Sequence, residues 1–455
     1  MTIKTDVLII GGGLAGLSAA RVLQGKKNYL LVEKEAGIGG LAASVEKNGF
    51  TFDYSGHLLH LHWKETGDLI LRLLKNNHFK LKRNSWIRLK DVEVPYPFQA
   101  NLYNLPDDIK SECVSGFLEA YAANKSQVAA ARQRGSKTAG QQVSAAGEPQ
   151  KQPEVFSDWT RRVFGEGISK HFMLPYNAKL WQYPLNRLTA DWCAPFVPMP
   201  KPQEVLEAAY LPKRTTMGYN PVFYYPKRGG IRALPEALAK GLKGIHTGCE
   251  LKSLDLKRKI AFIKGLGPVK YERLINTMPL KHFVGLIKSP PAGLKAHNSR
   301  LRHNTVYVLN LGVKGTSVKK HWTYFPEKEF LFYRAGIATN FSRHLAPKGC
   351  DSLYIETATA GCALNLAAAE KKILRGLIKG GVIKSEGDIV EKLWLKIPCA
   401  YVIYDAARNI SLPAIISILA DNDVSSIGRY GAWKYSFMEE SVKEGLETAK
   451  KIINL

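Results

Sequence analysis

The N-terminal part of the chain alternates between apolar runs and a helical segment in the order of a βαβ unit. Residues 6–10 (Asp-Val-Leu-Ile-Ile) form a short apolar run of the kind that fits a buried parallel strand. Residues 15–23 can form a helix, and residues 29–33 read as a second strand. This order predicts an α/β fold that opens with a Rossmann-like nucleotide-binding unit.

Later segments show apolar residues at three- and four-residue steps, the pattern of amphipathic helices. Such helices are predicted at residues 69–74, 109–121 and about 157–180. Two more are expected toward the C-terminus, at about 367–379 and 441–453. The first three predict a helical domain in the middle of the chain.

Strand patterns dominate two other stretches, residues 251–278 and 306–359, which are rich in β-branched and aromatic residues and bounded by turns. The second stretch includes the run 331–334 (Leu-Phe-Tyr-Arg), and a further strand is expected at 389–397. Together these runs predict a larger, mostly antiparallel sheet.

The stretch 123–154 breaks these patterns. It contains no aromatic residue and is dominated by Gln, Ala, Ser, Gly and Lys, which predicts a mobile surface loop. A chain of 455 residues is longer than one hydrophobic core usually supports. Two or three domains are therefore expected.

The glycine-rich turn after the first strand fits the dinucleotide-binding fingerprint G-x-G-x-x-G, at the start of the predicted helix. Glu33 ends the second strand, where a carboxylate would accept the hydroxyls of an adenosine ribose. A glycine pair follows directly and favours FAD over NAD, and no second fingerprint for NAD(P)H occurs. The residues predicted to bind FAD here are Gly11, Gly13, Leu14, Ala15, Gly16, Glu33, Lys34, Gly39, Gly40 and Leu41.

A second FAD-binding segment is predicted at residues 428–435 (Gly-Arg-Tyr-Gly-Ala-Trp-Lys-Tyr). Its glycines permit close backbone approach, and an arginine there can reach a phosphate or the flavin ring. By itself such a segment would more often be a turn carrying a surface arginine. The residues assigned to FAD in this segment are Gly428, Arg429 and Trp433.

The motifs and patterns together predict three domains. A Rossmann-like FAD-binding domain of the glutathione-reductase type would be discontinuous, with residues 1–63, 200–300 and 400–455. A helical domain would be inserted at 64–199, and an antiparallel substrate domain would occupy 301–399.

Five segments resemble the UDP-galactopyranose mutases, particularly the eukaryotic type, within the broader amine-oxidase and protoporphyrinogen-oxidase-like flavoproteins. They are 94–99 (VPYPFQ), 172–181 (FMLPYNAKLW), 322–326 (WTYFP), 332–334 (FYR) and 428–435 (GRYGAWKY). The fingerprint and the last segment are shared by the broad superfamily, whereas the PYPFQ and PYNxKxW motifs are considerably more specific.

The resemblance implies a redox-neutral pyranose/furanose interconversion of a nucleotide sugar on reduced FAD. Flavin N5 would attack the anomeric carbon, UDP would leave, and the ring would open and close in the other size before UDP returns. Tyr96 and Gln99 would hold the uracil. The resemblance also implies catalytic roles for His57 beside the flavin, for Arg334 at the diphosphate, and for Tyr324, Tyr401 and Tyr435 around the pyrophosphate and sugar, with Tyr176, Asn177, Trp181 and Trp322 as further substrate-binding residues.

Some of these residues also admit plainer interpretations. Arg334 lies in an otherwise apolar run, so either a carboxylate or a substrate phosphate must face it, because an unpaired buried charge is costly. The histidines at positions 57, 60 and 62 would not share one face of a strand, and no nearby cysteine or carboxylate cluster completes a ligand set. No metal is therefore predicted.

The chain departs from the family in three places. Leu174 stands where the family has an arginine that helps bind the diphosphate, and the glycine pair before the flavin histidine is reduced to Ser55–Gly56. Glu439 and Glu440 follow the position where the family places an amide, and a carboxylate beside phosphate repels it. Either the substrate has diverged from UDP-galactose, or nearby basic residues compensate, the candidates being Lys170, Lys179, Lys227 and Arg228.

An alternative function is a true FAD-dependent oxidoreductase. In an amine-oxidase-like or protoporphyrinogen-oxidase-like enzyme the flavin takes a hydride from an amine or a C–H bond. In such an enzyme the substrate would bleach the oxidised flavin. A mutase would instead act only with reduced FAD and would consume no reductant.

The net charge is +26, from 65 Lys and Arg against 39 Asp and Glu, and such a field attracts anionic ligands. No nucleic-acid recognition module accompanies it, so we expect an anionic small-molecule substrate and no nucleic acid. No apolar run is long enough to span a membrane or reads as a secretory signal. The six cysteines form no C-x-x-C pair, which predicts reduced thiols and a cytoplasmic enzyme.

Overall fold

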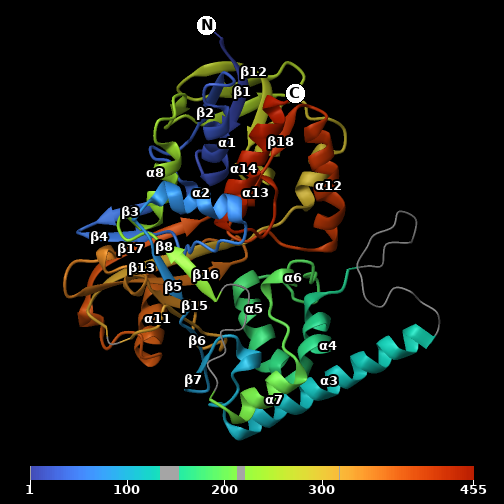
Figure 1. Cartoon of the computed structure of the whole chain (residues 1–455), viewed down its shortest axis with the longest axis vertical. Helices are drawn as coiled ribbons and strands as arrows, with labels where there is room; N and C mark the ends of the chain where they lie inside the picture. Colours follow the sequence, from blue (N-terminus) through green and yellow to red (C-terminus); the bar gives the residue numbers. More distant parts are fainter. Residues whose placement is uncertain (1, 134–152, 213–220, 317) are drawn as a thin grey trace.

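The computed structural model describes residues 2–133, 153–212, 221–316 and 318–455. Its first sheet has seven strands in the order β10-β11-β12-β1-β2-β9, with β18 paired to β12. Figure 1 labels β1, β2, β12 and β18 of this sheet. Strands β12, β1, β2, β9 and β18 run parallel, while β10 and β11 are antiparallel additions at one edge. The strands are β1 (Ile3–Ile10), β2 (Tyr29–Val32), β9 (Ile245–His246), β10 (Leu251–Asp255), β11 (Ile260–Ile263), β12 (Gly267–Asn276) and β18 (Val424–Ser426).

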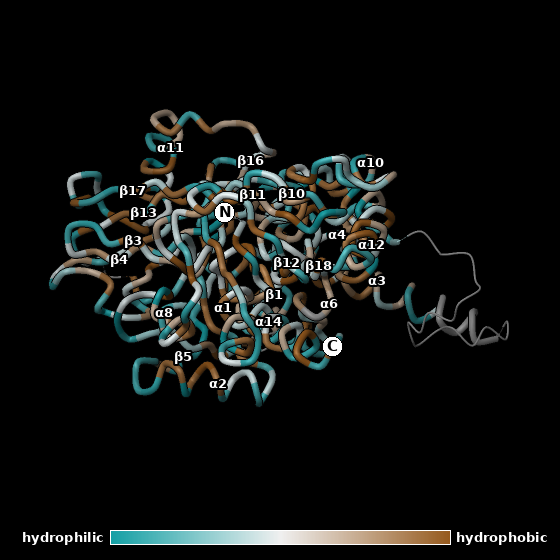
Figure 2. Tube along the Cα trace, turned by 90° about the horizontal axis from the view of Figure 1, so that it is seen from above, coloured by the Kyte–Doolittle hydropathy of each residue, from teal (hydrophilic) through white to brown (hydrophobic). Residues whose placement is uncertain are grey.

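Helices pack against this sheet and confirm the predicted Rossmann-like α/β unit. Helix α1 (Leu14–Leu23) follows β1 and packs against α14 (Met438–Ile453), the predicted closing helix, which begins three residues earlier than expected. In Figure 2 apolar residues follow the inner strands and helices, and polar residues gather on the outer loops. The other helices of this part are α2 (Lys64–Leu74), α8 (Ala233–Ala239), α9 (Leu280–Gly285), α10 (Leu294–Arg300), α12 (Ala406–Ala420) and α13 (Gly428–Gly431).

A second sheet of seven strands has the order β17-β13-β16-β15-β14-β6-β7 and is antiparallel except between β14 and β6. Helix α11 (Leu366–Lys379) covers one face of it through a separate apolar core. The strands are β6 (Ser85–Leu89), β7 (Val92–Pro95), β13 (Thr305–Lys314), β14 (Trp322–Tyr324), β15 (Arg334–Ile337), β16 (Cys350–Thr359) and β17 (Ile389–Ile397).

Two strand predictions need correction. Residues 251–278 supply β10, β11 and β12 to the first sheet, not to the antiparallel one, because β12 pairs in parallel with β1. The run 331–334 is not a strand, and Arg334 is instead the first residue of β15. Sequence composition identifies a strand but does not say which sheet its backbone will join.

The helical part lies beside the second sheet (Figure 1). Residues 123–133, predicted as the start of a loop, instead continue the long helix α3, because alanine and glutamine are good helix formers. The remainder of that predicted loop, 134–152, falls outside the described residues. The helices are α3 (Asp107–Gln133), α4 (Phe156–Ile168), α5 (Leu174–Trp181), α6 (Cys193–Phe196) and α7 (Pro202–Tyr210), with a π-helical turn at Ser169–Met173 before α5.

Two small antiparallel sheets of two strands each complete the fold, β3 (Ser44–Lys47) with β4 (Phe50–Asp53), and β5 (Phe79–Lys82) with β8 (Val222–Tyr225). Among the described residues, none of the helices has the length and apolar character needed to cross a membrane.

Candidate functional site

The predicted dinucleotide turn is built so that only glycine fits at its key positions. Gly11 has φ of 105°, and its N–H donates to the carbonyl of Val32 at 2.8 Å. A Cβ on Gly16 would lie 2.1 Å from the carbonyl oxygen of Gly11. Strand β1 and helix α1 therefore meet at the distance that the third glycine of the fingerprint permits.

The second glycine segment closes on the first. The N–H of Gly39, which has φ of 115°, donates to the carbonyl of Gly12 at 2.8 Å, and Gly13 and Gly39 form an isolated bridge. A Cβ placed on Gly13 would have no neighbour nearer than 3.9 Å. Gly13 precedes the first residue of α1 and offers no side-chain cap, and the first turn of the helix has no acidic residue, so this open cradle fits a dinucleotide diphosphate.

The Glu33 carboxylate is buried where the prediction requires it. Its Oε2 accepts a hydrogen bond from the backbone of Gly12 at 2.8 Å, and Oε1 accepts one from Glu35 at 2.9 Å. These bonds fix the carboxylate at the carboxyl end of β2. Its role toward the ribose stays a prediction.

The segment 428–435 lies against the same helix. A Cβ on Gly428 would come within 3.0 Å of the Ala15 side chain, so this turn closes over the start of α1. The Arg429 guanidinium donates to the carbonyls of Ala400 and Ser436, at 3.1 and 2.6 Å. Trp433 is fully buried, and its indole Nε1 has no partner in the described structure.

Six of the predicted aromatic residues form two groups of contacting rings that lie close enough to each other to interact electrostatically. The Tyr324 ring lies 5.3 Å from that of Tyr96 and 5.1 Å from that of Tyr176. The Tyr401 ring stacks on that of Tyr435 at 5.9 Å and lies 5.7 Å from Trp181. These residues come from segments far apart in the sequence. We refer to the aromatic cluster as Tyr96, Tyr176, Trp181, Tyr324, Tyr401 and Tyr435.

Two predicted substrate residues have their side chains engaged within the protein. Gln99 is buried and donates to the carbonyl of Pro198 at 2.7 Å. Asn177 donates to the carbonyl of Met173 at 2.8 Å and accepts from the Trp181 indole at 3.1 Å. In this arrangement Asn177 orients Trp181 in the cluster.

The carboxylate of Glu356 faces Arg334. Arg334 donates from Nε and Nη2 to the two oxygens of Glu356, both at 2.6 Å. Glu356 also accepts from the hydroxyl of Ser55. Burial opposes its charge, but Arg334 and the hydrogen bonds from Ser55 and Tyr333 outweigh burial and lower the pKa of Glu356. Sequence reasoning missed Glu356, although an acidic residue directly after the apolar run 353–355 of β16 was a usable signal.

His57 lies on the loop that carries Ser55. Burial, reinforced by the positive charge of Arg429, lowers the pKa of His57 to about 4, so the ring is neutral at pH 7. Its Nδ1 is buried and has no partner in the described structure, which leaves a polar atom for a flavin to contact.

The two acidic residues that departed from the family pattern are engaged elsewhere. The Glu439 carboxylate accepts from the backbone N–H groups of His62 and Trp63, at 2.5 and 3.1 Å. Glu440 pairs with Lys434 at 2.5 Å. Both carboxylates are thus tied to protein groups, and their effect on a bound phosphate stays a prediction.

Two of the four proposed compensating cations, Lys170 and Lys179, are committed to other partners, whereas no ion pair of Lys227 or Arg228 is found among the described residues. Lys170 pairs with Glu112 at 2.7 Å. Lys179 donates to the carbonyls of Phe325, Glu327 and Phe332, and burial lowers its pKa to about 7. Arg83, a cation that sequence reasoning did not name, also contacts the aromatic cluster. Its guanidinium carbon lies 4.0 Å from the ring centroid of Tyr96.

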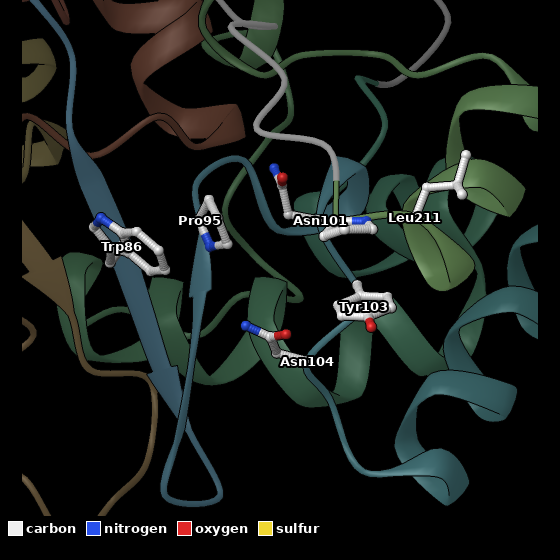
Figure 3. A pocket seen from close by; sticks show the side chains of 7 residues that line it. Trp86, Pro95, Asn101, Tyr103, Asn104 and Leu211 are labelled. Carbon is white, nitrogen blue, oxygen red and sulfur yellow. The ribbon is translucent and has the colours of Figure 1, made fainter.

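A pocket lies next to the hairpin β6–β7 that carries the PYPFQ segment (Figure 3). Trp86 and Pro95 of the hairpin line it, and so does Leu211, the residue that follows α7. None of the predicted site residues lines this pocket. The remaining lining residues are Asn101, Tyr103, Asn104 and Pro212.

The start of β6 depends on a neutral histidine, which predicts a pH effect on stability. The backbone N–H of Asn84 donates to Nδ1 of the buried His321 at 3.1 Å, and burial lowers the pKa of His321 from 6.5 to about 4. Between these values the unfolded chain binds a proton that the folded chain excludes. We therefore expect His321 to remove up to ~3 kcal/mol of unfolding free energy as the pH falls from 6.5 to 4.

Urea titrations of the wild type and of His321→Asn, which keeps an acceptor near the Nδ1 position, would measure this contribution. The variant should show a flatter dependence of the free energy of unfolding on pH across the same window. Parallel curves for the two proteins would contradict the prediction.

The comparisons with known proteins agree with this geometry. Residues 9–74 match the family model of an NAD(P)-binding Rossmann-like domain. The crystal structure of reduced UDP-galactopyranose mutase superposes with a TM-score of 0.88 at 26% sequence identity, covering 99% of this chain and 94% of that one. The chain resembles UDP-galactopyranose mutase along its whole length.

More distant structures share the fold alone. A protein from Exiguobacterium sp. 255-15 assigned as a protoporphyrinogen oxidase has a TM-score of 0.71 at 14% identity, covering 100% of this chain and 99% of that one. Putrescine oxidase bound to putrescine has a TM-score of 0.68 at 15% identity, with both chains fully covered. The likeness to the mutase, taken with the glycine cradle and Glu33, supports an FAD-dependent enzyme.

Proposed function

We propose that this protein is an FAD-dependent mutase that interconverts the pyranose and furanose forms of a nucleotide sugar. The observation that carries the proposal is the convergence of the aromatic cluster with Arg334. Tyr324 and Arg334 are paired across β14 and β15, and Tyr176 lies against both Tyr324 and Tyr333. The two motifs most specific to the mutase resemblance, PYPFQ and PYNxKxW, thus supply rings to one place.

The chain's own residues would bind and orient the substrate. Tyr96, Tyr176 and Tyr324 present three neighbouring rings, a surface suited to a flat base. Tyr401 and Tyr435 stack on each other beside Arg429 and supply hydroxyls for a sugar. Buried rings on these sides would exclude water from the reacting carbon.

Reduced FAD, when bound, would supply the nucleophile for the anomeric carbon. The residues that hold FAD would be those of the glycine cradle, Glu33 and the segment 428–435. A neutral His57 adds no positive charge beside the flavin, and its unpartnered Nδ1 would be an acceptor or donor for the ring system.

The decisive experiment reduces the purified flavoprotein anaerobically and adds UDP-galactofuranose. The expected result is conversion to UDP-galactopyranose with no consumption of reductant, and no conversion by the oxidised protein. If no sugar nucleotide isomerises while an amine or an alcohol bleaches the oxidised flavin, the protein is an oxidoreductase and the proposal is wrong.

We also propose that the enzyme works in the cytoplasm. All six cysteines are free, and Cys113, Cys193, Cys249 and Cys399 are buried among apolar residues. Burial raises the pKa of the thiols of Cys113 and Cys399 to about 12, so they are unreactive core residues. Cell fractionation with an antibody to the protein would test the location.

A further inference from the structure

Arg83 lies between β5 and β6, at the border of the aromatic cluster. Its guanidinium carbon is 4.0 Å from the ring centroid of Tyr96 and 5.1 Å from that of Trp322. Its Nη2 donates to the hydroxyl of Tyr324 at 3.0 Å, and its Nε donates to the hydroxyl of Ser85 at 2.7 Å. The guanidinium is therefore held in one orientation by two rings and two hydroxyls.

The residues that hold Arg83 share one face of the second sheet with Arg334. Trp322 pairs with Ser85 across β14 and β6, and Tyr324 pairs with Arg334 across β14 and β15. Side chains two residues apart on a strand point to the same face, so Trp322 and Tyr324 lie on it together. Tyr324 thus stands between the two arginines, bonded to Arg83 and adjacent to Arg334.

The two arginines differ in how their charge is balanced. Arg334 forms a two-point ion pair with Glu356, whose side chain is only 1% exposed. Arg83 has no carboxylate within 4.0 Å among the residues that the structure describes; the groups that hold it are hydroxyls and rings. A half-buried, oriented guanidinium without a carboxylate is suited to bind an anion by charge-assisted hydrogen bonds.

We propose that Arg83 binds the diphosphate of the nucleotide-sugar substrate and supplies the positive charge that Leu174 does not. This inference rests on the proposed function, because it takes the aromatic cluster as the substrate site. Lys170 and Lys179, the nearer candidates in sequence, are tied to Glu112 and to backbone carbonyls. Arg83 is 91 positions away in the sequence and is brought to the cluster only by the pairing of β6 with β14.

Calorimetric titration of the FAD-loaded protein with UDP, uridine and inorganic pyrophosphate tests the proposal. Arg83→Met removes the charge and keeps the aliphatic stem, whereas Arg83→Lys keeps the charge and loses the planar fork. Arg88→Met is the matched control, because Arg88 lies on β6 but pairs with Asp91. Bound flavin and circular dichroism would verify that each variant is folded.

We expect Arg83→Met to raise the Kd for UDP about 10- to 100-fold and to change the Kd for uridine less than about twofold. Arg83→Lys should recover part of the loss, and Arg88→Met should match the wild type. If Arg83→Met binds UDP as tightly as the wild type, the assignment is wrong while the mutase proposal stands. An equal loss for UDP and uridine would also overturn it, because that result indicates a structural role.

Pyrophosphate separates the two proposals. If the wild type binds pyrophosphate but neither UDP nor uridine, the nucleotide-sugar function fails. In that case a loss of pyrophosphate binding in Arg83→Met would still support an anion site at Arg83, and unchanged binding would refute it.

Discussion

Gly16→Ala is expected to yield a protein that retains less than roughly a tenth of the FAD bound by the wild type and is destabilised by about 3 kcal/mol or more. The added Cβ would lie 2.1 Å from the backbone oxygen of Gly11 and 3.3 Å from the Ile9 side chain. The backbone of Gly11 cannot move out of the way unless α1 moves away from β1. The measurement is flavin absorbance per mole of purified protein, together with urea denaturation.

Gly37→Ala is the matched control, since Gly37 lies in the same glycine-rich region but is exposed and has nothing within 4 Å of an added Cβ. It should bind flavin normally. Normal flavin content in Gly16→Ala would show that the close approach of α1 to β1 is not required for binding.

Glu356→Ala is expected to lower the free energy of unfolding by about 3–5 kcal/mol, because it leaves the guanidinium of Arg334 without its carboxylate. The Arg334 side chain is 18% exposed and Glu356 is 1% exposed, so water offers little compensation. Urea denaturation at pH 7 measures the loss. The isosteric Glu356→Gln should be less severe, since its amide keeps one acceptor for Arg334.

A double-mutant cycle separates the ion pair from simple packing. In Arg334→Met/Glu356→Gln no lone charge remains, so its destabilisation should be clearly smaller than the sum of the single changes. Glu329→Gln, which breaks only the exposed pair with Lys379, is the control and should leave the denaturation curve unchanged. A strictly additive cycle would show that Arg334 and Glu356 do not stabilise each other.

The dinucleotide end of the candidate site was predictable because its backbone geometry is local. This end consists of the turn 11–16, the glycine pair at 39–40 and Glu33, which lie within or next to the β1-α1-β2 unit in sequence. The backbone conformation and close packing of the turn and of the pair specify glycine directly. The closing segment 428–435 was identified by its own glycines, and the structure brings Gly428 against α1. The positions in residues 11–40 are set by short-range geometry, whereas the contact of Gly428 with α1 depends on tertiary packing.

The substrate end was predictable only in part. Resemblance identified the rings of the aromatic cluster, but it did not reveal the protein partners of the neighbouring side chains. Asn177 and Gln99 bond to neighbouring protein groups, and Glu439 supports the backbone of His62 and Trp63. A side chain's partner depends on which surfaces pack together, and neither residue type nor spacing specifies that.

By itself the sequence determined an α/β fold with a Rossmann-like dinucleotide site, because strand and helix periodicity and glycine's backbone freedom are encoded locally. Only the tertiary structure decided how charge is distributed around the aromatic cluster. Strands β14, β15 and β16 place Glu356 beside Arg334, and the parallel pairing of β6 with β14 brings Arg83 to Tyr324. Long-range strand pairing sets these neighbours. It therefore decided that Arg334 has a carboxylate partner and that Arg83 has none among the described residues.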